Sequence, residues 1–106
     1  MSASPAVLVL STFPADRDPA PLAEALVTER LAACVNILPP MQSVYRWQGA
    51  VERAAEHQLI IKTTAARVED LEARLTALHP YEVPELIVLP VAGGGDAYLR
   101  WIYESA

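Results

Sequence analysis

A long extended stretch constrains this chain more than any other feature of its sequence. Between Cys34 and Thr63 only a short Ala-Glu patch could favour a helix, and polar and apolar residues alternate after Ser43. Gln48-Gly49 is a plausible turn between two arms. Each arm has about 15 residues and would span roughly 50 Å at ~3.3 Å per residue. A compact chain of this size has a diameter near ~34 Å, so the hairpin is longer than the domain that carries it.

Two explanations of this excess length remain open. Pro39-Pro40 interrupts the first arm and predicts a bend or a sheet edge, because proline cannot donate to a strand ladder. A sharp curl at these prolines would keep the hairpin within its own domain. The alternative is that the tip of the hairpin lies on another subunit.

The segments around the hairpin alternate between strands and helices. Ala6–Leu10 is an unbroken apolar run, which predicts a strand buried on both faces. Asp18 is the predicted N-cap of a helix that ends near Cys34. Thr64 is the predicted N-cap of a second helix, which Pro80 ends. The predicted buried stripe of this second helix is Val68, Leu71, Leu75 and Leu78.

The order of these segments predicts the fold class. Leu86–Leu89 is a last apolar strand, and Asp96 caps a short final helix. The order is therefore βαββαβ with an extra C-terminal helix, which predicts an α+β, ferredoxin-like sandwich with an extended hairpin. Right-handed crossovers predict the first and third strands as central, parallel neighbours. Residues 1–106 are predicted to form a single domain with an ordered core over about residues 6–104.

Composition excludes several classes of protein. The chain has 8 Lys and Arg against 13 Asp and Glu, a net charge of −5, which disfavours nucleic-acid binding. The single cysteine, Cys34, cannot form an internal disulfide. The apolar run near the start has no basic flank and is too short to cross a bilayer. We therefore expect a cytoplasmic protein without membrane partners. Its 53% hydrophobic share is high for so short a chain, which favours apolar surface shared between subunits.

Five sequence blocks, in order, resemble the CutA family of divalent-cation-tolerance proteins over nearly the whole chain. The blocks are Ala32-Ala33-Cys34-Val35-Asn36-Ile37, Ser43-x-Tyr45-x-Trp47-x-Gly49, Glu56 with Leu59-Ile60-Ile61-Lys62-Thr63, His79-Pro80-Tyr81-x-x-Pro84-Glu85, and Tyr98-Leu99-x-Trp101. The resemblance implies a ferredoxin-like homotrimer, similar in architecture to PII signalling proteins, with hairpins paired across subunits. It also implies a role in tolerance of copper and other divalent cations, with no accepted catalytic reaction.

The chain departs from the family at the positions associated with copper. Copper-binding members carry a cysteine at the end of the first strand and a His-His pair before Pro-Tyr. This chain has Ser11 and Leu78-His79 there, and serine is a poor ligand for a soft metal. His79 is left as a candidate ligand for weakly bound Cu²⁺ or another divalent cation, and Cys34 is a weaker candidate. The alternatives are a helix C-terminal cap for His79 and a small buried apolar residue for Cys34.

Five residues of the blocks are candidates for a cleft between subunits: Trp47, Glu56, Lys62, Tyr81 and Glu85. Lys62 follows an apolar run, so it must extend to solvent or pair with a carboxylate, and Glu56 and Glu85 are the expected partners. One interpretation is a polar pocket of the kind in which PII-type trimers take small anionic ligands. The other is a network that stabilises the trimer, with aromatic anchors.

Three functional hypotheses follow from these residues. The first is a non-enzymatic, homotrimeric divalent-cation-tolerance protein. The second is a trimeric scaffold or small-ligand signalling protein that does not bind metal directly. The third is an enzyme with Cys34 as nucleophile and His57 or His79 as base, which requires hydrogen-bond reach between the two groups. Without such a role, His57 is expected on a solvated face of the hairpin.

Overall fold

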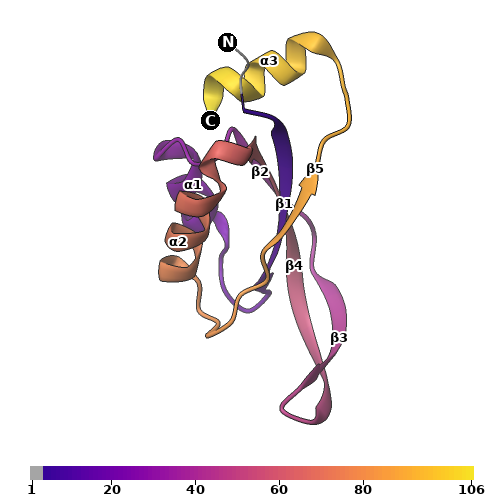
Figure 1. The fold of residues 1–106 in the computed structure, drawn as a ribbon. Helices are drawn as coiled ribbons and strands as arrows, with labels where there is room; N and C mark the ends of the chain where they lie inside the picture. The colour runs from indigo at the N-terminus through magenta and orange to yellow at the C-terminus, as the bar shows by residue number, and fades with distance from the viewer. Residues whose placement is uncertain (1–3) are drawn as a thin grey trace.

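Within residues 4–106, which the computed structural model describes, five strands form one sheet and two helices cover one of its faces (Figure 1). The chain therefore has the α+β fold that the sequence predicts. The elements in chain order are β1 (Ala6–Pro14), α1 (Ala20–Thr28), β2 (Cys34–Ile37), β3 (Met41–Trp47), β4 (Ala50–Thr64), a 3₁₀ turn (Ala65–Arg67), α2 (Val68–Leu78), β5 (Ile87–Pro90) and α3 (Asp96–Ser105).

The sheet has the order β2-β4-β1-β5, and β3 pairs with the first half of β4. The central neighbours β1 and β4 are antiparallel, with Val9 opposite Ile61, so the prediction of parallel neighbours is wrong. Each strand-helix-strand unit leaves a gap between its two parallel strands. A strand of the other unit fills that gap in the opposite direction: β4 lies between β1 and β2, and β1 lies between β4 and β5.

The hairpin of β3 and β4 extends beyond the body of the molecule, toward the bottom of Figure 1. The interruption expected at the two prolines is confirmed, because β2 ends at Ile37 and β3 begins at Met41. The turn is also confirmed, since Gln48 (φ 50°) and Gly49 (φ 82°) connect the paired residues at its ends. The molecule measures 49 × 25 × 24 Å, and its radius of gyration of 14.5 Å exceeds the ~13 Å of a compact chain of this length.

The main core lies between the sheet and the pair α1 and α2. Alternation along β1 and β4 points one set of side chains toward the helices. This core contains Val7, Val9, Leu26, Ala32, Ile61, Leu71 and Leu75. A second cluster lies on the opposite face, where Ile102 of α3 packs on Ala6 and Ala33. Among the described residues, no helix is long and apolar enough to span a membrane.

Two helix boundaries differ from the sequence predictions. Helix α1 ends at Thr28 rather than near Cys34, because Arg30 adopts a left-handed conformation (φ 59°). The Arg30 and Leu31 amides then bond back to the Val27 and Leu26 carbonyls, which closes the helix end. Helix α2 is preceded by a 3₁₀ turn after Thr64, whose side chain makes no cap bond.

The stripe of helix α2 is only partly buried. Leu71 and Leu75 are fully buried, Val68 is half-buried, and Leu78 is exposed. The prediction that Leu78 belongs to the buried stripe is therefore wrong. The last turn of α2 extends past the core, and the chain leaves it at His79.

Candidate functional site

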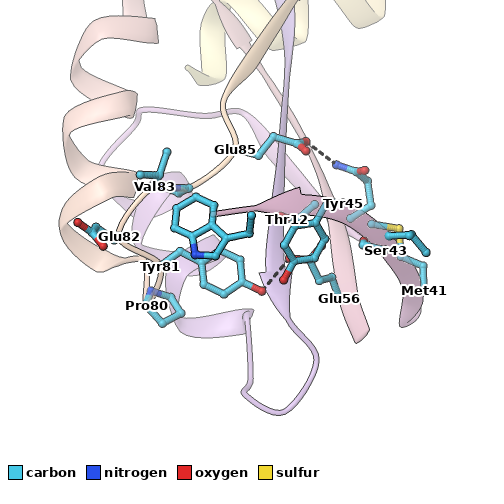
Figure 2. Close-up of a pocket in the computed structure, with 14 residues that line it drawn as sticks. Thr12, Met41, Ser43, Tyr45, Glu56, Pro80, Tyr81, Glu82, Val83 and Glu85 are labelled. Atoms are coloured by element: carbon cyan, nitrogen blue, oxygen red, sulfur yellow. Dashed lines mark hydrogen bonds between the residues drawn. The ribbon is translucent and has the colours of Figure 1, made fainter. Parts of the chain in front are cut away.

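A cavity of about 790 Å³ lies where the hairpin leaves the body of the sheet (Figure 2). Its walls come from β1, β3, β4 and the segment that follows α2. The lining residues are Thr12, Met41, Ser43, Val44, Tyr45, Trp47, Glu56, Gln58, Pro80, Tyr81, Glu82, Val83, Pro84 and Glu85.

Strand alternation brings the hairpin residues together. Ser43, Tyr45 and Trp47 lie two positions apart along β3, so their side chains share one face. Met41 lies directly opposite Glu56 in the β3–β4 register, which extends the same face onto β4. Four of the five predicted cleft residues therefore line a single cavity: Trp47, Glu56, Tyr81 and Glu85.

Glu56 is the buried charged residue of this cavity. Its side chain is only 7% exposed, and its Oε2 accepts a 2.7 Å hydrogen bond from the Tyr81 hydroxyl. Burial raises the pKa of Tyr81 above its ordinary value, and the hydrogen bond to Glu56 and the charge of Glu56 raise the pKa further. Tyr81 therefore keeps its proton and remains the donor to this carboxylate.

His79 fixes the start of the segment that carries Tyr81. Its Nε2–H donates to the Thr12 carbonyl at 2.6 Å, and its Nδ1 accepts from the Tyr81 amide at 3.0 Å. The ring is 8% exposed and packs against Phe13, with ring centroids 5.3 Å apart. Both ring nitrogens are thus bonded within the chain, so a metal ion could bind His79 only by displacing one of these bonds.

The neighbouring positions do not fit a copper ion either. Ser11 is fully buried beside the core, and its Oγ has no hydrogen-bond partner within the described chain. Leu78 has no ligand atom. Across residues 4–106, no group of three or more His, Cys, Asp or Glu side chains is arranged to hold a metal ion.

Lys62 lies apart from the other four cleft candidates. It is six positions beyond Glu56 on β4, which is about 20 Å at ~3.3 Å per residue. Its Nζ donates a 3.2 Å hydrogen bond to the Tyr98 hydroxyl of α3, and this bond raises the pKa of Lys62. Within the chain, the carboxylates expected as its partners are bonded elsewhere: Glu56 to Tyr81, and Glu85 to Gln58 at 3.4 Å.

Cys34 is half-buried at the start of β2 and pairs with Lys62 in the sheet register. His57 lies five positions before Lys62 on the same strand, about 16 Å away at ~3.3 Å per residue. His57 is also not free on a solvated face, because its Nδ1 bonds to the Leu38 carbonyl at 2.8 Å. The structure therefore does not bring Cys34 and His57 together as nucleophile and base.

Thr12 and Gln58 also line the cavity, although the sequence did not predict them there. Gln58 lies two residues after Glu56 on an extended strand, so period-two alternation could have placed it on the same face. Its Nε2 donates to the Ser11 carbonyl at 2.7 Å. The local sequence around Thr12 gives no such indication, because Thr12 reaches the cavity only through the pairing of β1 with β4.

Comparison with known proteins gives consistent matches. Residues 7–105 match the family described as CutA1 divalent ion tolerance protein. The divalent-cation tolerance protein CutA of Thermus thermophilus is 49% identical over 92% of this chain and 95% of its own length. The chloroplastic protein CutA of Arabidopsis thaliana is 46% identical over 95% of this chain and 56% of its own length. The crystal structure of CutA1 from Oryza sativa superposes with a TM-score of 0.93 at 42% identity, over 98% of this chain and 95% of that chain.

Proposed function

This chain belongs to the CutA1 family of divalent ion tolerance proteins, and on that basis we propose that it acts in divalent-cation tolerance as a non-enzymatic homotrimer of PII-like architecture. The family is described by tolerance of ions rather than by a reaction. The separation of Cys34 from His57 also supports a function that does not use these two residues as nucleophile and base.

The projecting hairpin is the observation that supports the proposed homotrimer most directly. Its apolar side chains point into solvent in the single chain: Val51 is 67% exposed and Val44 60% exposed. Both residues point to one face of the hairpin, because Val51 pairs with Arg46, two positions after Val44. Tyr45 and Trp47 point to the other face, which the cavity occupies. Exposed apolar side chains on a projecting hairpin mark an interaction site, and copies of the same chain are its natural partners.

The homotrimer is tested by size-exclusion chromatography with light scattering. We expect the protein to have three times the mass of one chain. Val51→Asp places a charge on the apolar hairpin and should shift the mass toward that of one chain. The matched control is Val27→Asp, at an exposed apolar position on α1, which should leave the mass unchanged. A monomer at micromolar concentration would exclude the homotrimer.

We infer that the tolerance role does not depend on a copper ion held by His79. The support is that both His79 ring nitrogens are bonded, to Thr12 and to Tyr81. Calorimetric titration with Cu²⁺ should therefore give the same isotherm for the wild type and for His79→Ala, and His57→Ala serves as the histidine control. A loss of one binding site in His79→Ala alone would restore His79 as a ligand.

A second candidate function is small-ligand binding by the same homotrimer. The cavity favours it, because about 790 Å³ lies within the ~300–1,000 Å³ range of small-molecule sites. Its walls combine aromatic side chains with a buried carboxylate, which is a mixture typical of ligand pockets. We also propose that the protein is located in the cytoplasm. The relative from Arabidopsis thaliana is named chloroplastic, so cell fractionation is the test of this location.

A further inference from the structure

We propose that the cavity beside the hairpin binds a small organic ammonium compound, with its positive charge placed between the Glu56 carboxylate and the aromatic rings of the cavity. This inference rests on the proposed small-ligand function of the same cavity and adds the chemical class of the ligand. It differs from the anionic ligand that PII-type architecture suggests.

The sign of the charge in the cavity is the first argument. The charged side chains among its fourteen lining residues are all glutamates: Glu56, Glu82 and Glu85. Glu56 is the most buried of them, and its single bonding partner in the cavity, the Tyr81 hydroxyl, is neutral. An anion brought here would be repelled by three carboxylates, whereas a cation would supply the charge that balances Glu56.

The aromatic lining is the second argument. Tyr45 and Trp47 of β3 and Tyr81 of the segment after α2 all contribute to the cavity walls. Tyr45 and Trp47 are 40% and 42% exposed, so part of each ring is available to a ligand. The faces of aromatic rings attract cations, and ammonium groups are commonly held in such cages.

The size of the cavity and the hydrogen bonds of its carboxylates favour an organic cation over a bare metal ion. A metal ion needs several oxygen atoms converging at about 2.0–2.6 Å. Here Glu56 is held by Tyr81, and Glu85 accepts from Gln58 (Figure 2). Within residues 4–106 no group of three or more His, Cys, Asp or Glu side chains is placed to hold a metal ion. A cavity of about 790 Å³ fits a molecule that has an ammonium group and an apolar body, with which Val83 and Pro84 can pack.

The test compares three probes in calorimetric titrations of the full chain. Choline carries a quaternary ammonium group, 3,3-dimethylbutan-1-ol is its neutral isostere, and adenosine monophosphate is an anion. We expect choline to bind at least about tenfold more tightly than the neutral isostere, since the two differ only in the charge that interacts with the cage. We expect adenosine monophosphate to bind more weakly than either.

A charge-removing variant locates the binding. Glu56→Gln keeps an oxygen that can accept the Tyr81 hydroxyl, so the cavity should keep its shape while it loses a charge. Choline should bind about tenfold more weakly to this variant, and the neutral isostere should bind as before. The matched control is Glu69→Gln, at an exposed acidic position on α2 outside the cavity, which should leave choline binding unchanged. Circular dichroism and the light-scattering mass check that each variant is folded and assembled.

Each contrary outcome has its own meaning. Equal affinity for choline and its neutral isostere, or unchanged choline binding in Glu56→Gln, overturns the ammonium assignment. Preferred binding of adenosine monophosphate overturns it too, while the small-ligand function survives with the opposite charge. If none of the three probes binds, the ammonium assignment and the small-ligand function are both overturned, and the homotrimer is unaffected.

Discussion

At the scale of single residues, the contact between Tyr81 and Glu56 decides how a carboxylate can stay buried at this site. The Tyr81 hydroxyl supplies the hydrogen bond that water would give to an exposed carboxylate. Burial and this bond also raise the pKa of Tyr81. The two effects reinforce each other, because a phenol that keeps its proton remains a donor.

This contact predicts a loss of stability at alkaline pH. Tyr81 has a higher pKa in the folded chain than its ordinary value of 10.0, so its contribution is complete below pH 10.0. Above that pH the unfolded chain loses the tyrosine proton first, and the free energy of unfolding falls as pH rises. Urea unfolding should show a shallower alkaline decline for Tyr81→Phe than for the wild type.

At neutral pH the free energy of unfolding of Tyr81→Phe should be about 1.5–3 kcal/mol lower than that of the wild type, which is the range for a hydrogen bond to a charged group. Tyr103→Phe, at an exposed position on α3, is the matched control and should follow the wild type at every pH. Parallel pH profiles for Tyr81→Phe and the wild type would contradict the assigned role of Tyr81.

The residue types in the sequence predicted four residues of the cavity correctly but misplaced Lys62. The sequence groups Trp47, Glu56, Tyr81 and Glu85, and these four residues line one cavity. The sequence also places Lys62 in this group, because a lysine after an apolar run needs solvent or a partner for its charge. Its partner is Tyr98 of α3, and the packing of a helix 36 residues away on that end of β4 leaves no signal near Lys62.

At the scale of elements, the hairpin was the most predictable part of the fold. Alternation over β3 and the Gln48-Gly49 pair are local signals, and both appear in the structure as expected. The end of α1 was not predictable in the same way. Arg30 holds a left-handed conformation while its guanidinium donates to the Glu104 carbonyl at 2.7 Å, and this distant contact is invisible in the local sequence.

The turn of the hairpin gives a prediction at this scale. Gly49 has φ 82°, a conformation that strains any residue with a Cβ atom. Gly49→Ala should therefore lower the free energy of unfolding by about 1 kcal/mol, measured by urea denaturation. Gly93→Ala is the matched control, because Gly93 has open space around it and no such backbone conformation, and it should unfold like the wild type. Equal losses in both variants would show that the turn conformation is not the cause.

At the scale of the whole molecule, the exposed apolar hairpin links stability to assembly. If three chains cover one another's hairpins, unfolding also separates the chains, so dilution favours the unfolded state. The Tm should therefore rise with protein concentration in calorimetric scans. The Tm of Val51→Asp should be lower and independent of concentration, while Val27→Asp should keep the concentration dependence of the wild type. A wild-type Tm that does not change with concentration would contradict obligate assembly.

Strand β4 belongs both to the core of the molecule and to the projecting hairpin, so it connects the two mechanically. Its second half is fixed in the core through Leu59 and Ile61, and its first half forms one arm of the free hairpin. Glu56 and Gln58 lie where the fixed half meets the free half, on the wall of the cavity. A tilt of the whole hairpin about this junction would therefore move the Glu56 carboxylate that faces the cavity.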